Sequence, residues 1–344
     1  MSARGSGPRV LAVRQDNAGD VLLAGPAVRA LADRASAVTL LAGPRGRAAA
    51  DLLPGVDRVV EWCAPWIDPE PGPVGEAGVV EFAATVRSLQ VDAAVVFTSF
   101  HQSPLPLALL LRLAGVPWIG GISEDYPGSL LDLRHRSEDD QPEPERALSL
   151  ARAAGFALAD GDDGRLAVRR PLPDVEHLTG PSGYVVVHPG ASAPAREWST
   201  EQYADAVTAL AGRGDRVVVT GSREQKSLTA EVAASGGLDL GGTTDFAELA
   251  AVLDRARVVV APNTGPAHLA AAVGTPVVSL FAPVVRAARW APYGVPTAVL
   301  GDQHAPCQDT RARVCPVAGH PCLSEVTTDD VLRAVDRVAE EVAR

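Results

Sequence analysis

Twice along this chain, short continuous apolar runs alternate with segments of helical periodicity. Continuous apolar runs are typical of strands buried on both faces, and parallel strands need helical crossovers to connect them. The alternation therefore predicts an α/β protein in which helices cover parallel sheets. Strands are expected at 10–13, 38–41 and 93–97 in the first half and at 184–188, 216–220 and 258–261 in the second, with helices at 20–34, 200–211 and 245–255.

The length of 344 residues exceeds one typical core and predicts two domains. Glycine and proline cluster between 160 and 183, which is typical of a linker. We place the first domain at 1–172 and the second at 173–326. The remaining segment, 327–344, predicts an amphipathic helix that would be free to pack back on the first domain. Its apolar face is formed by Val331, Val335, Val338 and Val342.

Composition limits the function classes. A hydrophobic content of 47% and a charged content of 21% predict a globular protein. The net charge of -11 disfavours nucleic-acid partners and anionic membrane surfaces. The longest apolar stretch, 105–111, is too short to span a bilayer, and no apolar signal segment precedes Arg9. We expect a cytoplasmic protein with no nucleic-acid partner and no transmembrane segment, while peripheral membrane contact stays open.

Within the segment 260–272 a buried apolar strand ends, the chain turns on small residues, and a helix begins at once. The first turn of a helix leaves N–H groups unpaired and carries partial positive charge, so a phosphate fits there. Thr264 or Asn263 can cap the helix. Gly265 keeps the backbone approachable, and His268 adds a further donor. For this segment alone, an ordinary capped helix with a hydrogen-bonded histidine is an equally good interpretation.

A second loop of small residues follows the strand expected at 184–188. Within it Arg196 supplies a fixed cation, and the spacing from Ser199 to Gln202 is that of a capping box opening the next helix. Ligands of doubly wound sheets bind at the carboxyl ends of strands, so the two loops together predict a diphosphate site. A surface ion pair between Arg196 and Glu197 is the alternative.

The first domain offers a carboxylate in the corresponding place. Asp20 follows a strand and a short polar loop and lies at the start of a helix, where it is a candidate general base. The helix N-terminus lowers the pKa of such a carboxylate, so proton transfer is expected to be late. A simple N-cap role is the alternative. His101 follows another strand end and is a candidate acceptor contact, with a hydrogen-bonded loop histidine as the alternative.

Three segments resemble glycosyltransferase family 9, the ADP-heptose:lipopolysaccharide heptosyltransferases and their relatives. The resemblance implies a GT-B fold, in which two facing Rossmann-like domains with parallel sheets leave a cleft between them. It also implies a donor held mainly by the second domain, an acceptor held by the first, and inverting, metal-independent transfer with no cofactor. The segments are Gly19-Asp20-Val21-Leu22, the loop 188–198, and the block 263–272 together with 276–281.

The resemblance also implies residue roles. Asp20 matches the catalytic aspartate of the family, and Arg196 stands where a phosphate-binding lysine is common. Asn263 replaces a common aspartate, which reduces repulsion of a diphosphate. The implied contacts are Ser192, Arg196, Asn263, Thr264, Gly265 and His268 for the donor diphosphate, and Ser222, Glu224 and Thr243 for the donor base or ribose.

The expected function is transfer of a sugar, heptose by resemblance, from ADP-heptose to a hydroxyl of a saccharide or small-metabolite acceptor. Asp20 would take the hydroxyl proton while both helix ends and Arg196 stabilise the departing diphosphate. One alternative is a non-catalytic sugar-nucleotide binding module, which only Asn263 supports. Another is a dinucleotide-dependent oxidoreductase, but no Gly-x-Gly-x-x-Gly follows the first strand and no acidic residue follows the second.

Cysteines gather near the C-terminus. Cys307, Cys315 and Cys322 share one stretch with His304 and His320, so a zinc site or a disulfide has to be considered. Their spacing matches no Cys-x-x-Cys knuckle, and cytosolic thiols are normally reduced. We therefore predict no metal site here.

Overall fold

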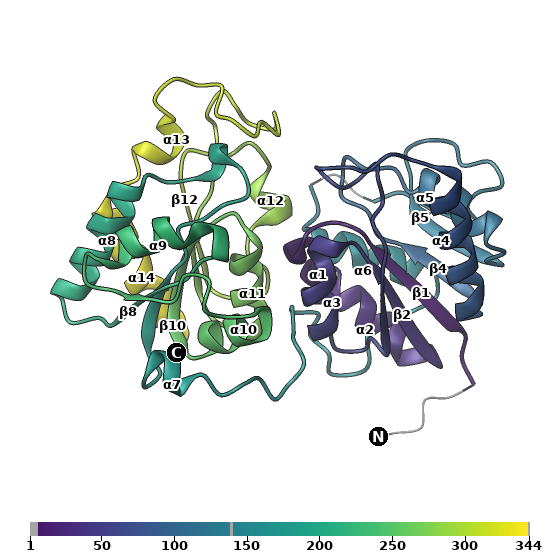
Figure 1. Ribbon diagram of the computed structural model, residues 1–344, viewed down its shortest axis with the longest axis horizontal. Helices are drawn as coiled ribbons and strands as arrows, with labels where there is room; N and C mark the ends of the chain where they lie inside the picture. The colour runs from purple at the N-terminus through teal and green to yellow at the C-terminus, as the bar shows by residue number, and fades with distance from the viewer. Residues whose placement is uncertain (1–5, 138–139, 343–344) are drawn as a thin grey trace. The chain divides into compact units, whose positions relative to one another are not determined.

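The computed structural model describes residues 6–137 and 140–342, and the chain divides into two compact units (Figure 1). Unit 1 is Met1–Val168 and unit 2 is Arg169–Arg344. Their boundary lies a few residues before the expected one at 172 and inside the glycine- and proline-rich segment that was expected to link the domains.

Unit 1 is built on a six-stranded sheet with the order β3-β2-β1-β4-β5-β6, and all its strand pairs are parallel. This is the strand order of the Rossmann fold, in which the direction of the crossovers reverses beside the first strand. The carboxyl end of β1 therefore lies at the switch point, where such sheets bind ligands. The strands are β1 (Arg9–Arg14), β2 (Ala37–Ala42), β3 (Arg58–Glu61), β4 (Ala93–Val96), β5 (Trp118–Ile122) and β6 (Leu133–His135).

Helices pack on both faces of this sheet (Figure 1). The single helix expected at 20–34 is instead two helices that meet at Ala24. Pro26 is the reason, because it has no N–H to continue the bonding of the preceding turn and is favoured in the first turn of a new helix. The helices are α1 (Ala18–Leu23), α2 (Gly25–Arg34), η1 (Pro44–Gly46), α3 (Arg47–Leu52), α4 (Glu76–Leu89), α5 (Leu105–Leu113) and α6 (Glu143–Ala153).

Unit 2 repeats the topology. Its sheet has the order β12-β11-β10-β7-β8-β9 with parallel pairs throughout, so β7 and β10 flank the switch point. The loops after these two strands are the two that the sequence marked for a diphosphate. The strands are β7 (Tyr184–Val187), β8 (Val217–Val219), β9 (Leu238–Asp239), β10 (Ala256–Pro262), β11 (Val277–Leu280) and β12 (Thr297–Leu300).

The last helix, α14 (Thr328–Val342), belongs to the core of unit 2. Val331, Val335 and Val338 are fully buried among residues of that unit, whereas Val342 is exposed. The apolar face of α14 was expected to be free to pack on the first domain, but it packs inside unit 2. The other helices of unit 2 are α7 (Glu176–Thr179), η2 (Pro194–Arg196), α8 (Thr200–Gly212), η3 (Arg223–Gln225), α9 (Lys226–Ala233), α10 (Phe246–Asp254), α11 (Gly265–Val273), α12 (Ala287–Trp290) and α13 (Pro321–Ser324).

Candidate active site

In unit 2, α11 starts almost directly after β10. Thr264 takes the expected capping position with an extended backbone, but its side chain makes no capping hydrogen bond. Asn263, beside it, is buried. Pro266 has no N–H and Ala267 donates its own to the Thr264 carbonyl at 3.1 Å. Because the cap offers no side-chain acceptor, the Gly265 N–H is the first-turn donor that remains available to an anion.

His268 lies in the first turn of α11 and is buried. Burial, and secondly the positive charge of Arg196, lower its pKa to about 4. The imidazole is therefore neutral at neutral pH. Its Nδ1 atom has no hydrogen-bond partner within 6–137 and 140–342. A buried polar atom left in this way is one that a ligand would satisfy.

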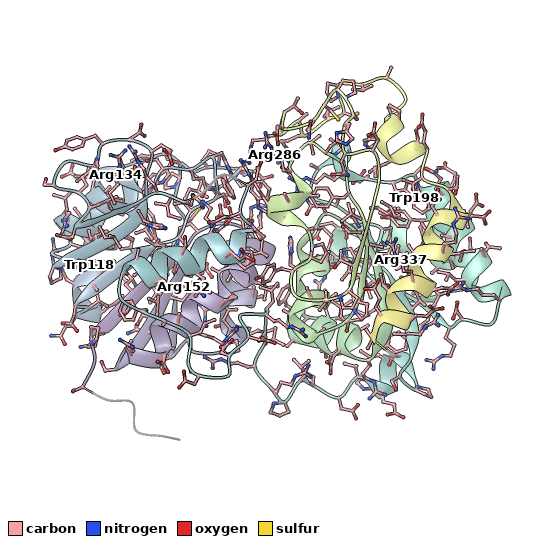
Figure 2. The ribbon with its side chains drawn as sticks, turned by 180° about the vertical axis from the view of Figure 1, so that it is seen from behind. Trp118, Arg134, Arg152, Trp198, Arg286 and Arg337 are labelled. Atoms are coloured by element: carbon pink, nitrogen blue, oxygen red, sulfur yellow. The ribbon has the colours of Figure 1, made fainter. Side chains whose placement is uncertain are left out.

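Arg196 ends η2, in the loop after β7. Its Nη1 atom donates to the carbonyl oxygen of Asn263 at 3.4 Å, so the loops after β7 and β10 meet. Trp198, labelled in Figure 2, is buried just beyond this arginine, and its ring packs edge-on against Tyr203 with centroids 5.0 Å apart. Ser192, earlier in the loop, is exposed. The structure thus brings the expected cation beside the expected helix end.

His188, at the end of β7, is the second buried histidine of this edge. Its Nδ1 atom lies 3.0 Å from Thr220 Oγ1, and burial lowers its pKa to about 4. It is therefore neutral like His268, which leaves Arg196 as the charged member of this group.

The loops after β8 and β9 reach the same edge of the sheet. Ser222 and Glu224 are exposed, and a hydrogen bond with Ser222 lowers the pKa of Glu224. Gln225 Oε1 accepts a hydrogen bond from the Ser222 N–H at 2.9 Å. The Gln225 amide also packs closely against Gly190, because a Cβ added at Gly190 would lie only 2.1 Å from Gln225 Nε2. Gln225 thereby joins the β8 loop to the β7 loop. Thr243 donates its hydroxyl to a carbonyl of its own loop at 2.8 Å.

In unit 1, Asp20 lies in the first turn of α1, whose N-cap residue is Asn17. The simple N-cap role is therefore wrong for Asp20. Its side chain is 21% exposed, and its Oδ1 atom accepts a hydrogen bond from Arg14 Nη2 at 3.2 Å. An accessible carboxylate at the switch point of the sheet has the position that a general base needs.

Arg14 is the last residue of β1, and its side chain is 1% exposed. Its Nε atom lies 2.7 Å from Asp16 Oδ2, and its Nη1 atom lies 3.3 Å from Glu143 Oε2. Nη2, besides binding Asp20, donates to Ser99 Oγ at 2.9 Å. Burial lowers the pKa of Arg14, but the three carboxylates together raise it further, so this residue stays charged.

The two other carboxylates of this cluster are more deeply buried than Asp20. Burial raises the pKa of both Asp16 and Glu143, although the charge of Arg14 opposes the shift in each. The exposed His101 acts electrostatically on Asp16 and so lies near this cluster. Of the two residues singled out in the first domain, Asp20 contacts Arg14 directly and His101 lies near Asp16.

Sequence reasoning missed Arg14, Asp16, Ser99 and Glu143. A signal for Arg14 was present, because a charged residue ending a continuous apolar strand must find partners when the strand is buried. No comparable signal existed for Glu143, which lies far along the chain at the start of α6.

The cysteines near the C-terminus form a thiol cluster in the core of unit 2. Cys307 and Cys322 are buried and Cys315 packs against them. Burial, aided by the neighbouring thiols, raises the pKa of Cys322 to about 12. Within the described ranges no group of three or more histidine, cysteine or acidic side chains is arranged to hold a metal ion. A protonated thiol is a weak metal ligand and a weak nucleophile, so the cluster contributes packing.

Comparison with known proteins identifies the family. The model of glycosyltransferase family 9 (heptosyltransferase) matches residues 80–320, and the chain belongs to this family. A curated relative, lipopolysaccharide heptosyltransferase 3 of Escherichia coli, is 29% identical over 179 residues, which are 49% of this chain and 51% of the relative. The chain therefore spans about half the length of the curated relative that it matches.

Solved structures show the same fold. The glycosyl transferase family 9 structure from Veillonella parvula DSM 2008 has a TM-score of 0.77 at 15% identity, covering 99% of both chains. The ADP-heptose lps heptosyltransferase II of E. coli has a TM-score of 0.73 at 18% identity, covering 98% of this chain and 100% of that one. These similarities confirm the expected α/β, GT-B fold class. Among the helices that the structure describes, none is long and apolar enough to cross a membrane.

Proposed function

We propose that this chain is an inverting glycosyltransferase that moves heptose from ADP-heptose to an acceptor hydroxyl without a metal ion. One observation carries the proposal: at the switch point of unit 2, Arg196 lies beside the uncapped start of α11 and beside a neutral, buried His268. A fixed cation, the Gly265 N–H at the positive end of the helix and an unpaired ring nitrogen suit a diphosphate leaving group. Membership of family 9 supports the choice of reaction.

The diphosphate contacts are assigned to the loops after β7 and β10. Arg196 and His268 would bind its oxygens through side chains, and Gly265 through its backbone N–H. Ser192, Asn263 and Thr264 complete the set as polar residues of the same loops. Ser222, Glu224 and Thr243, on the two neighbouring loops, are assigned to the adenosine part of the donor. The name of the similar heptosyltransferase II supports ADP-heptose as the first donor to test.

The reaction assigned to the chain is a single displacement. The acceptor oxygen forms a bond to the anomeric carbon as its proton passes to the Asp20 carboxylate. The bond between the anomeric carbon and the diphosphate oxygen breaks, and its electron pair leaves with ADP. Attack from the face opposite the leaving group inverts the anomeric centre. Positive charge from Arg196 and the α11 end would stabilise the developing diphosphate, so no divalent cation is required.

The acceptor is assigned to the edge of unit 1 that carries Asp20 and His101. A hydroxyl of a saccharide or small metabolite in the cytoplasm is the expected nucleophile, because the net charge of -11 disfavours anionic membrane surfaces.

The direct test measures ADP release from ADP-heptose with and without a panel of saccharide acceptors, in the presence of a chelator. We expect acceptor-dependent ADP release, a product of inverted anomeric configuration, and no loss of rate on chelation. ADP should also raise the apparent melting temperature more than other nucleoside diphosphates. Donor binding without hydrolysis or transfer across the panel would instead indicate a non-catalytic sugar-nucleotide module.

A further inference from the structure

The cation at the centre of the unit 1 cluster is held unusually firmly. A fully buried guanidinium is costly unless it is paired and hydrogen-bonded. Arg14 Nη1 donates to Glu143, and Nη2 donates to Asp20 and Ser99. Nε makes no hydrogen bond, but it lies 2.7 Å from the Asp16 carboxylate as an ion pair. A planar fork held by two donors and one ion pair is restricted in its orientation.

The partners of Arg14 are themselves fixed by different elements. Glu143 begins α6 and is 1% exposed, with its Oε1 atom 3.7 Å from Arg146 Nη1. Ser99, in the loop after β4, accepts from Arg14 and donates to Asp16 Oδ2 at 3.4 Å. Gln102 in the same loop donates to the other oxygen of Asp16. The guanidinium is therefore clamped between β1, the β4 loop and α6.

Asp20 is the most solvent-accessible carboxylate of this cluster. Its side chain is 21% exposed, against 7% for Asp16 and 1% for Glu143. Arg14 binds its Oδ1 atom, while its Oδ2 atom has no hydrogen-bond partner among the residues that the structure describes. Arg14 therefore holds Oδ1 of Asp20 in place, and Oδ2 is open to a ligand.

We propose that Arg14 is a positioning residue of the transfer reaction, which orients the Asp20 carboxylate so that its free oxygen faces the acceptor hydroxyl. Asp16 and Glu143 act behind it by fixing the guanidinium. This inference rests on the proposed function, because it needs Asp20 to be the base. Arg14 also brings a positive charge within hydrogen-bond distance of the Asp20 carboxylate. The other charges that reach Asp20 are those of Asp16 and Glu143.

The test compares Arg14→Lys with Arg29→Lys. Arg29 is a matched control in the same unit, because it binds Asp162 through Nε and Nη2 at 2.6 and 2.8 Å but lies outside the cluster. Lysine at 14 keeps the charge but cannot reach three carboxylates at once. We expect kcat to fall by roughly 100-fold in Arg14→Lys, as misplacement of a reacting group does. The KM for ADP-heptose should not change, and Arg29→Lys should keep the original kcat.

A pH profile separates positioning from structural support. In Arg14→Met the cation beside the proposed base is gone, so the acidic limb of kcat/KM should move to higher pH. A limb that stays in place, or an Arg14→Lys enzyme with the original kcat, would overturn the proposal. The proposal would also be overturned if the loss of kcat were fully explained by a loss of folded protein, as judged from the melting temperature. If Arg14→Met does not fold, Arg14→Lys still decides the matter.

A parallel variant distinguishes this inference from the proposed function. Asp20→Asn should lose turnover whether or not Arg14 positions it. If Asp20→Asn is inactive while Arg14→Lys is fully active, only the role of Arg14 fails. If Asp20→Asn remains active, the assignment of the base fails, and the role of Arg14 fails with it.

Discussion

The two sheets have the same strand order, but their carboxyl edges carry different buried polar groups. In unit 1 a buried arginine, Arg14, is surrounded by carboxylates, among them Asp20. In unit 2 the buried groups are the neutral histidines His188 and His268, and Arg196 is the nearby cation. The fold fixes where a ligand binds, and the residues at the strand ends decide what is done to it.

Burial acts in opposite directions on the two kinds of group. It raises the pKa of Asp16 and Glu143 and lowers the pKa of His188 and His268. Both shifts favour the uncharged form, as desolvation must. The edge of unit 1 is thus suited to hold and move a proton, while the edge of unit 2 offers neutral donors and one cation to an anion.

The largest effect should come from removing the carboxylate at the unit 1 edge. Asp20→Asn keeps the shape but cannot accept a proton, so kcat should fall by about 10²- to 10⁴-fold. The affinity for ADP, measured by thermal shift, should not change, because the nucleotide is assigned to unit 2. Asp33→Asn, at an exposed position of the same unit, is the control and should behave like the original chain. If Asp20→Asn keeps its turnover, the assignment of the base to the unit 1 edge is wrong.

Acidification should affect the Arg14 cluster of unit 1 and the buried histidines of unit 2 in opposite directions. His188 and His268 have a pKa of about 4 when folded and about 6.5 when unfolded, so the unfolded chain binds more protons between these values. Each histidine therefore costs unit 2 up to about 3 kcal/mol of stability as the pH falls through that window. The carboxyls Asp16 and Glu143 have raised folded pKa values, so their contribution is present at low pH and is lost as the pH rises.

Hydrogen exchange resolves the two units within one chain. On going from about pH 7 to about pH 5, peptides of unit 2 should lose protection, after correction for the intrinsic pH dependence of exchange. Peptides around β1 and α6 in unit 1 should keep or gain it. His188→Asn is a useful comparison, because part of the acid sensitivity of unit 2 should disappear. A common direction of change in both units would contradict the prediction.

Parts of this contrast were readable in the sequence. Strands buried on both faces, such as β1 and β10, were predicted because their apolar runs are continuous. The edge strands β3, β6 and β9 were not predicted, because they are short and have exposed or half-buried residues, which leave no such run. The interior strands β5 and β11 were missed as well, because two glycines in β5 and a serine in β11 interrupt their apolar runs. The resemblance to a family identified Asp20 and Arg196 by position.

The Arg14 cluster was not predictable, because its members come from distant segments. Asp16 is near Asp20 in sequence, but Ser99 and Glu143 meet Arg14 only when β4 and α6 are in place. Pairing over such separations leaves no local pattern. The split between α1 and α2 was in principle visible at Pro26, but the apolar periodicity continues across it.

Removing the cation at the unit 2 edge should weaken ADP binding, which Asp20→Asn should leave unchanged. Arg196→Met deletes a charge-assisted hydrogen bond to the diphosphate, so ADP affinity should fall by about 10- to 100-fold. Turnover should fall with it, because the same charge stabilises the leaving group. The control is Arg257→Met, at the start of β10, where the arginine pairs with Asp215 at 2.7 Å. Unchanged ADP affinity in Arg196→Met would mean that the cation does not bind the donor.

The smallest effect should come from disturbing the contact between the β7 loop and the β8 loop of unit 2. In Gly190→Ala the new Cβ would lie 2.1 Å from Gln225 Nε2, so the glutamine must move and its bond to the Ser222 N–H is lost. We expect a cost of about 1 kcal/mol, as for loss of a helix cap, and a small drop in ADP affinity. The double variant with Gln225→Ala should cost no more than Gln225→Ala alone, because the clash is absent.

The matched control for this last pair is Gly212→Ala, at the end of α8, where an added Cβ meets no atom within 4 Å. Its melting temperature should equal or exceed that of the original chain, because alanine restricts the unfolded state. Additive costs for Gly190→Ala and Gln225→Ala would show that the two loops are independent. Non-additive costs would show that the donor edge, like the Arg14 cluster, depends on side chains that link separate strand ends.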